Sequence, residues 1–329
     1  MKYLLFLIPA FFFLSCGDSK PTSLKPLDLD SLLVKYPDSI PLLITRGTKL
    51  LKEYAFESAF ADGAKAYRLD SNNIQARLLY ADVLNNRPNR SVSDVLTAQR
   101  HFTFIIKKEP KNTKALVSLA TTYSQQQDFD KSFQYINVAL KIDPRYRDAY
   151  VLKGTNYLHL HNVKLAKSSY ETAVQQDPKF FEAYLMLGSL YQSENDKICL
   201  EYYKTAATLK PRNTDVLYAL AYADQLFNRL NESKKLYRKM IQIDTTYSEA
   251  LFQLGYIKQW LEKPTDMDSA MYFYNSCIQT SPDNVQAWHN LGICYLNKGD
   301  KPNAMLSFRK ALSFDPSFSL SKELIEKYN

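Results

Sequence analysis

Histidine and cysteine are the side chains most often used as metal ligands and nucleophiles, and this sequence has four of each. The histidines are His101, His159, His161 and His289, and none stands at metal-ligand spacing from a cysteine or a carboxylate. His159 and His161 point to different sides of a helix, so they would not share a metal. The sequence has no phosphate-binding glycine loop, nucleophile elbow or zinc-hydrolase motif. We therefore expect no catalytic site, no metal and no cofactor.

The first cysteine, Cys16, lies in a stretch that differs from the rest of the chain. Lys2 is followed by an apolar run at residues 3–14, which is too short to span a bilayer comfortably and is typical of a secretory signal. The run ends in Phe13, Leu14, Ser15, Cys16 and Gly17. This ending resembles the lipobox of bacterial lipoproteins, in which a small residue precedes a cysteine that is acylated and becomes the new N-terminus. Leu14 and Phe13 depart from the stricter form of that motif.

The resemblance implies a lipoprotein-type signal peptide at residues 1–15 and a lipidated Cys16. Residues 16–39 would then form a tether, with a partial capping helix at 27–36. Because Gly17 does not signal inner-membrane retention, we predict a lipid anchor in the cell envelope, with the outer membrane facing the periplasm favoured. The alternative is an ordinary cleaved signal in which Cys16 has no role.

The composition favours helices and gives no indication of nucleic acid. The chain has 24 Tyr, 18 Phe and only 8 Gly, a mixture that suits packed helices better than glycine-turned sheets. Its formal net charge is +8, but basic residues are spread beside acidic ones as on solvated helix faces. The aromatic-basic motifs of nucleic-acid modules are missing. We expect a protein or peptide partner, a membrane contact only through the lipid anchor, and no nucleic acid.

Prolines recur with a nearly constant spacing. They stand at Pro110, Pro144, Pro178, Pro211, Pro282 and Pro316, which are separated by 34, 34, 33, 71 and 34 residues. Residues 285–318 resemble the tetratricopeptide repeat pattern, W-x2-L-G-x2-Y, A-x3-F and P. The matching residues are Trp288, Leu291, Gly292, Tyr295, Ala304, Phe308, Ala311 and Pro316. The resemblance implies an all-α, right-handed superhelix of helix-turn-helix repeats, with a concave groove lined by the first helix of each repeat.

Aligned on that repeat, the chain contains eight repeats and a capping helix at 319–329. The repeats are 40–73, 74–112, 113–146, 147–180, 181–213, 214–247, 248–284 and 285–318. The eighth position is small in each: Gly47, Ala81, Ala120, Gly154, Gly188, Ala221, Gly255 and Gly292. Two helices that approach closely at this position require small residues. Repeat 1 is atypical, with Arg46 and Gly63 at core positions, and the capping helix places Leu320, Leu324 and Tyr328 on one side.

The family pattern also indicates which residues face the groove. Aromatic residues gather there in the last three repeats: Tyr218, Tyr222, Phe252, Tyr256, Trp260 and His289. Phe252, Tyr256 and Trp260 are four positions apart and would form one stripe, a feature enriched at interfaces. The alternative is that neighbouring helices cover these rings, or that the helix is rotated. In the same repeats Asp224 and Lys258 replace a core tyrosine, either as an ion pair across the stack or as a local irregularity.

The remaining cysteines, Cys199, Cys277 and Cys294, occupy repeat positions that call for small or apolar core residues. Buried free thiols are therefore expected. A disulfide between Cys277 and Cys294 is the alternative, because their helices should stack in a compartment that allows oxidation.

Together these patterns predict a non-catalytic scaffold or adaptor of the bacterial cell envelope that binds a partner segment in the groove. The alternative is a binding protein for glycan or cell-wall polymer, in which the aromatic stripe stacks on sugar rings. The family's two-carboxylate clamp for chaperone tails requires Asn directly after the position-eight glycine. Thr48, Thr155, Ser189, Tyr256 and Ile293 stand there instead, so we do not expect that clamp.

Overall fold

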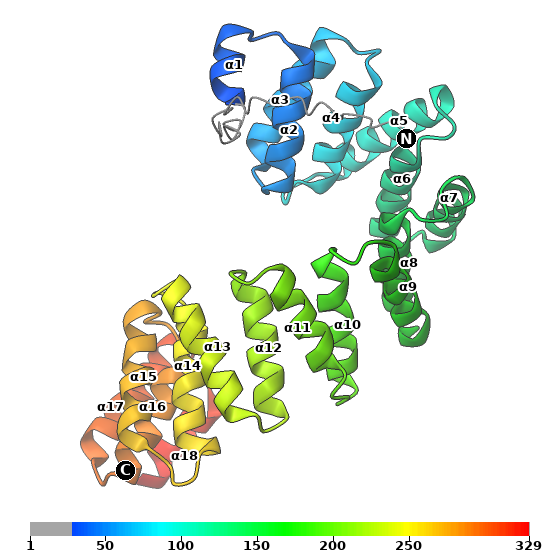
Figure 1. The fold of residues 1–329 in the computed structure, drawn as a ribbon. Coiled ribbons are helices and arrows are strands. Elements are labelled where there is room, and N and C mark those ends of the chain that lie inside the picture. The colour runs from blue at the N-terminus through cyan, green and yellow to red at the C-terminus, as the bar shows by residue number, and fades with distance from the viewer. Residues whose placement is uncertain (1–27, 329) are drawn as a thin grey trace, which may run out of the picture. The chain divides into compact units, whose positions relative to one another are not determined.

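The computed structural model describes residues 28–328, and every regular element in this range is a helix (Figure 1). The first helices of eight pairs are α2 (Ile40–Lys52), α4 (Ile74–Asn86), α6 (Thr113–Gln125), α8 (Arg147–His159), α10 (Phe181–Ser193), α12 (Thr214–Leu226), α14 (Ser248–Tyr256) and α16 (Val285–Asn297). Their second helices are α3 (Phe56–Leu69), α5 (Val92–Lys108), α7 (Phe129–Ile142), α9 (Val163–Gln176), α11 (Cys199–Leu209), α13 (Leu230–Ile243), α15 (Met267–Thr280) and α17 (Lys301–Phe314). The remaining elements are α1 (Leu29–Lys35), the π-helical turn η1 (Ile257–Leu261) and α18 (Ser319–Tyr328).

Helices adjacent in sequence pack against each other. Outside α5, first helices contact the second helices of their own pairs, as α6 contacts α7, and second helices contact the next first helix, as α7 contacts α8. Each first helix begins at the residue that opens a sequence repeat. The predicted fold class is confirmed in the described part of the chain, which has the paired helix-turn-helix packing of a tetratricopeptide-like solenoid.

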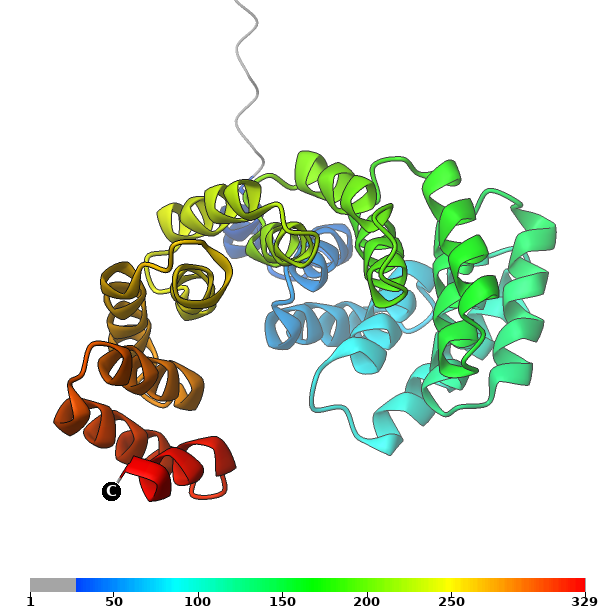
Figure 2. The ribbon, with the colours of Figure 1, turned by 90° about the horizontal axis from the view of Figure 1, so that it is seen from below.

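The chain divides into two compact parts. The N-terminal part extends to His101 and the C-terminal part begins at Phe102, so the division falls within α5. In the C-terminal part the helix pairs follow one another in chain order, from cyan to red (Figure 2). All residues of the groove described below belong to this part.

Glycine at the eighth position makes room for a ring from the second helix. A Cβ atom added at Gly188 would lie 2.5 Å from the ring of Tyr203, and one added at Gly292 would lie 2.5 Å from the ring of Phe308. Both rings are buried. The two helices of a pair therefore pack with a large ring against a glycine, rather than with one small residue against another. A larger residue at this position would overpack the contact.

Short polar side chains start several first helices. Asn112, Asn213 and Asn284 each accept a hydrogen bond from the backbone N–H three residues later, at 2.9, 2.9 and 2.8 Å. These bonds satisfy N–H groups that a helix start otherwise leaves unpaired. The same side-chain type therefore sets the start of α6, α12 and α16.

The N-terminal part explains why an arginine stands at a core position of repeat 1. Arg46 donates to both carboxylate oxygens of Asp62, at 2.8 and 2.7 Å, and Asp62 is buried. The bond from Arg46 to Asp62 is also the main reason that the pKa of this guanidinium is raised. A buried charge is tolerated when it is paired and hydrogen-bonded in this way. Leu33 of α1 and Leu43 are buried together beside this pair.

The capping helix α18 does not bury the face expected from the sequence. Ser321 is fully buried, and Leu324 and Ile325 pack against the last repeat, whereas Leu320 and Tyr328 are exposed. On the buried face, the Ser321 hydroxyl lies 2.9 Å from Nδ1 of His289, and this hydrogen bond holds Ser321 inward while the charged residues of α18 stay exposed. Sequence hydrophobicity alone does not register such a bond.

Some predictions lie outside the described residues. The signal peptide at residues 1–15, the lipidated Cys16 and most of the tether belong to residues 1–27. Within the described range, none of the helices has the length and apolar character needed to span a bilayer.

Candidate functional site

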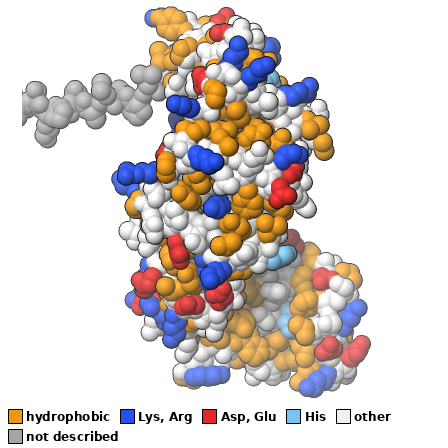
Figure 3. All heavy atoms as spheres, turned by 90° about the vertical axis from the view of Figure 1, so that its right-hand side faces the viewer, with side chains coloured by type: hydrophobic (Ala, Val, Ile, Leu, Met, Phe, Trp, Pro, Cys, Tyr) orange, Lys and Arg blue, Asp and Glu red, His pale blue; other side chains and the backbone are white. Residues whose placement is uncertain are grey.

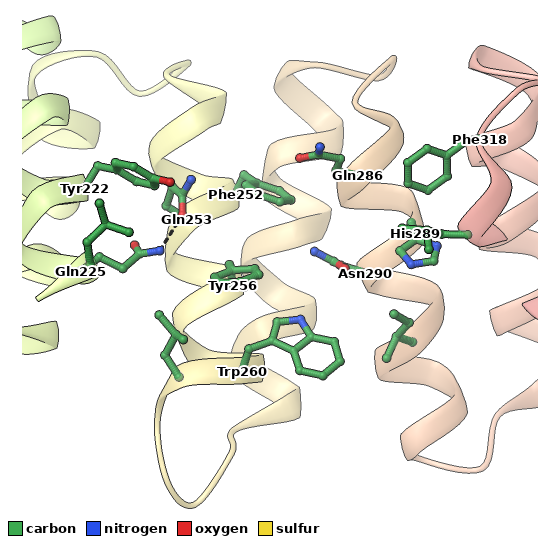
Figure 4. A pocket seen from close by; sticks show the side chains of 14 residues that line it. Tyr222, Gln225, Phe252, Gln253, Tyr256, Trp260, Gln286, His289, Asn290 and Phe318 are labelled. Carbon is green, nitrogen blue, oxygen red and sulfur yellow. Dashed lines mark hydrogen bonds between the residues drawn. The ribbon is translucent and has the colours of Figure 1, made fainter. Parts of the chain in front are cut away.

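A groove of about 640 Å³ crosses the first helices of the last three repeats. Its residues come from α12, α14, η1, α16 and the segment around Phe318 and Leu320 at the start of α18 (Figure 4). Five of the six residues predicted to bind a partner line it: Tyr222, Phe252, Tyr256, Trp260 and His289. The sixth, Tyr218, lies next to it, with its ring stacked 6.2 Å from that of Tyr222.

One wall of the groove is aromatic. The rings of Phe252 and Tyr256 lie 6.4 Å apart at an angle of 29°, and Trp260 follows with 44% of its surface exposed. Phe252 also packs on the buried core residue Tyr274, with ring centroids 5.8 Å apart. The stripe therefore changes along its length from partial core at Phe252 to exposed surface at Trp260.

A π-helical turn carries the exposed end of this wall. The amide of Glu262 donates to the carbonyl of Ile257 at 2.9 Å, a bond that spans five residues instead of four. Such turns are rare and occur frequently at functional sites. Because Trp260 lies within the turn, its direction differs from that of the next step of a regular α-helical stripe.

Asp224 and Lys258 do not pair across the stack. Asp224 forms an ion pair with Arg229 at 2.9 Å, whereas Lys258 pairs with Glu262 at 2.9 Å. Lys258 is the second residue of the π turn. The local irregularity, which was the alternative to an ion pair across the stack, is therefore present here. Glu262 also bonds Lys234. Burial acts to raise the pKa of Glu262, but the bonds from the two lysines outweigh it and leave the pKa lowered.

Amide side chains form the floor of the groove, and the sequence analysis did not single them out. Gln225 donates to Gln253 across neighbouring first helices at 3.1 Å, and Gln253 donates to the hydroxyl of Tyr218 at 3.2 Å. The buried hydroxyl of Tyr237 donates to Gln225 at 3.3 Å. Gln286 and Asn290 on α16 also line the groove (Figure 4).

A second glutamine repeats the arrangement one repeat later. Tyr274 donates to Gln259 at 2.7 Å, and Gln259 donates to the backbone carbonyl of Asn290 at 3.3 Å. Gln225 and Gln259 both occupy position twelve of their repeats, while Gln253 and Asn290 both occupy position six. This recurrence is a signal in the sequence that could have identified the floor.

His289 is far less accessible than its predicted role requires. Only 7% of its surface is exposed, because Phe318 packs edge-on against its ring at 5.2 Å and Ser321 bonds its Nδ1. Burial lowers the pKa of His289, so the imidazole is neutral near pH 7. His289 therefore contributes to the groove as a packed edge that supports α18 rather than as an exposed contact.

The groove carries no net charge of its own. None of the residues that line it is Lys, Arg, Asp or Glu. On the face shown in Figure 3, basic side chains are interspersed with acidic and hydrophobic ones. An occupant of the groove therefore meets aromatic carbon and neutral amides.

The described cysteines, Cys199, Cys277 and Cys294, are buried free thiols, and no disulfide joins Cys277 to Cys294. Burial raises the pKa of Cys277 and Cys294 to about 12. A thiol with such a pKa is protonated and a weak nucleophile. Within residues 28–328, no group of three or more His, Cys, Asp or Glu side chains could hold a metal ion.

Comparison with known proteins identifies three of the repeats. Sequence profiles described as "Tetratricopeptide repeat" match residues 113–146, 148–180 and 285–318. The last of these matches covers the helix pair α16 and α17, and so includes one side of the groove.

Similarity to characterised proteins is limited to parts of their length. A tetratricopeptide repeat-containing protein, trd-1 of Caenorhabditis elegans, is 26% identical over 117 residues, covering 35% of this chain and 15% of that protein. The BBSome complex member BBS4 homolog of Drosophila melanogaster is 26% identical over 121 residues, covering 36% of this chain and 24% of that protein. The matched region thus spans less than a quarter of either relative.

A solved structure resembles most of the chain. The crystal structure of the APC/C hetero-tetramer Cut9-Hcn1 superimposes with a TM-score of 0.57 at 15% identity, covering 91% of this chain and 58% of that chain. At this level of identity the likeness shows the fold alone.

Proposed function

We propose that this chain, which is a tetratricopeptide-repeat protein, is a non-catalytic scaffold that holds a segment of a partner protein in its aromatic groove. Proteins of this kind bind peptide and protein partners. The observation that carries the proposal is the aromatic wall of half-buried Tyr256 and exposed Trp260 above a floor of neutral amides. Large rings bury much area with little loss of conformational freedom, which is why they dominate the energetics of interfaces.

The proposed setting is the bacterial cell envelope. In this proposal Cys16 carries a lipid anchor, favoured in the outer membrane, and the repeats recruit another exported protein. The support is the lipobox-like sequence before Cys16 and the polar stretch after it. The partner is a protein, and no nucleic acid or cofactor takes part.

The partner-binding proposal is tested by cross-linking in native membranes followed by mass spectrometry. Tyr256→Ala and Trp260→Ala should each remove the same partner from the cross-linked set. Tyr272→Ala is the matched control, because Tyr272 is an exposed tyrosine on α15 that does not line the groove. Helix content measured by circular dichroism checks that each variant is folded. A partner set unchanged by both groove variants would overturn the proposal.

The anchoring proposal is tested separately by metabolic labelling with radioactive palmitate. Cys16→Ser should abolish incorporation and release the chain from the membrane fraction. Cys199→Ser, which changes a buried thiol of the repeats, should keep the label. Loss of the chain from membranes without any change in labelling would argue against acylation of Cys16.

The same groove also favours a second candidate function, the binding of glycan or cell-wall polymer. Aromatic rings and neutral amides without charged groups suit the stacking and hydrogen bonding of uncharged sugars. Retention of the chain on purified cell wall, lost in Trp260→Ala and kept in Tyr272→Ala, would support this function. Co-purification of a protein with the same dependence on Trp260 would support the scaffold.

A further inference from the structure

We propose that the segment held by the groove is internal to its protein, uncharged and extended, and that the floor amides bond its main chain. This inference rests on the proposed scaffold function and specifies the chemistry of the partner. It is carried by three properties of the groove: its amide floor, its lack of charge and its two apolar walls.

The floor amides favour an extended occupant over a helical one. A primary amide has two N–H donors and two acceptor lone pairs. The amide of Gln253 uses one donor in its bond to Tyr218 and one acceptor lone pair in the bond that it receives from Gln225. One donor and one acceptor lone pair of Gln253 therefore remain. A helix satisfies its own main chain and would cover these amides with apolar side chains, at the cost of buried polar groups without partners. An extended segment presents N–H and C=O groups that can pair with them.

The absence of charge favours an internal segment. A terminal carboxylate or a charged side chain placed in the groove would lose its hydration and meet no counter-ion among the lining residues. The ionic cluster at the π turn is already paired, with Glu262 bonded by Lys258 and Lys234. The groove therefore selects against chain ends and against charged residues.

Two apolar walls favour a run of apolar residues. Tyr256 and Trp260 form one wall and Phe318 forms the other, and the amides of Gln286 and Asn290 lie between them (Figure 4). Leu320 also lines the groove. Successive side chains of an extended segment point to opposite sides. A segment whose main chain follows the amide floor would direct alternate side chains to the two walls, so consecutive apolar residues are needed to fill both.

The test starts from a random seven-residue peptide library, displayed within a loop so that no chain end is free. The library is panned on the full chain carrying Trp288→Phe, which leaves Trp260 as the single tryptophan and as a fluorescent reporter of the groove. An enriched peptide is then synthesised with both ends blocked. Versions with a free terminal carboxylate, with a central lysine, with methylated main-chain nitrogens and with a helix-stabilising cross-link are compared with it.

The blocked peptide should shift the fluorescence of Trp260, and each of the four altered versions should bind about tenfold more weakly or not at all. Gln286→Leu should weaken the blocked peptide but not the version methylated at the nitrogen that faces Gln286. Gln175→Leu on α9 is the matched control, since Gln175 is an exposed glutamine that does not line the groove.

The outcomes separate this inference from the scaffold proposal. If peptides bind with the expected dependence on Trp260 but the methylated or the cross-linked helical version binds equally well, the extended segment is excluded while the scaffold function stands. Equal or tighter binding of the version with a free carboxylate excludes the internal segment in the same way. If no enriched peptide affects Trp260, both proposals fail.

Discussion

Two places in the C-terminal part join neighbouring first helices through polar side chains, and they do so differently. Between α6 and α8, the hydroxyl of Ser124 donates to Asn156 at 2.5 Å, and Asn156 donates to Ser132 at 2.8 Å. Between α12 and α14, Gln225 donates to Gln253 at 3.1 Å. The first network is closed inside the stack, with Asn156 and Ser132 fully buried, whereas the second opens onto the groove.

The difference shows how polar side chains of the same fold can stabilise the stack in one repeat and be available to bind a partner in another. Serine and asparagine are short, so their bonds are completed beneath the surface, where a partner segment cannot reach them. Glutamine is longer, and Gln253 reaches the surface with part of its bonding capacity left. We therefore expect changes in the closed network to affect stability most, and changes in the open one to affect binding.

The largest expected effect is that of Asn156→Leu. It leaves the hydroxyls of Ser124 and Ser132 buried without their partner and should lower the free energy of unfolding by about 3 kcal/mol. Urea unfolding of the full chain, followed by circular dichroism, measures this. Replacing both serines by alanine in the same chain should recover most of the loss, because apolar groups then replace all the partners. A loss below about 1 kcal/mol would contradict the assignment of a closed network.

In the N-terminal part, a similar contact between neighbouring helices involves a charged side chain. It predicts that the stability of this part depends on pH. Nη1 of Arg77 lies 3.1 Å from Nδ1 of His101, which can accept this bond only when the imidazole is neutral. Burial, together with the charges of Arg77 and Arg100, lowers the pKa of His101 to about 4 from 6.5. The unfolded chain therefore binds the proton first, and stability present above pH 6.5 is lost as the pH falls toward 4.

Between pH 7 and pH 5 this loss should reach about 2 kcal/mol, smaller than the effect of removing Asn156. Hydrogen exchange of the amides of α4 and of α5 up to His101, corrected for the intrinsic effect of pH, measures it. His101→Phe keeps a ring beside Tyr67 and Tyr80 and should remove the dependence on pH. Exchange that depends on pH equally in both proteins would assign the effect to another group.

A smaller effect is expected in the open network. Gln225→Leu removes the acceptor of the buried Tyr237 hydroxyl, but Gln253 stays free to bond water in the groove. The free energy of unfolding should fall by about 1 kcal/mol. Gln192→Leu, at the same position of repeat 5, is the matched control and should stay within about 0.5 kcal/mol. A loss as large as that of Asn156→Leu would show that both networks are structural to the same degree.

The sequence predicted the fold well because repeats depend on local spacing. Prolines, small residues and core tyrosines recur at a period that only stacked helix pairs satisfy, and each pair contacts its neighbours alone. The buried face of α18 was predicted only in part. Leu324 packs inward as expected, whereas Leu320 and Tyr328 are exposed, and Ser321 is turned inward by a bond to His289 that joins residues 32 positions apart. Local hydrophobicity does not contain such a contact.

The groove was predicted in part for the same reason. Phe252, Tyr256 and Trp260 were singled out because aromatic residues on a helix face are conspicuous, and they line one groove, although their role in binding stays a prediction. The floor was missed because a glutamine on a helix is usually solvated. Only its pairing with the next repeat distinguishes Gln225 from Gln192, and the regular period of the helices does not predict the π turn at Trp260.

The smallest expected effect concerns an amide that lines the groove without joining two helices. Gln286 is exposed, so Gln286→Leu should change the free energy of unfolding by less than about 0.5 kcal/mol in urea. The same substitution should weaken binding of the blocked peptide about tenfold, because the bond lost there is one to the occupant. A stability loss that matches Gln225→Leu would place Gln286 among the structural amides. The open network would then differ from the closed one only in its exposure to solvent, because both would act on stability.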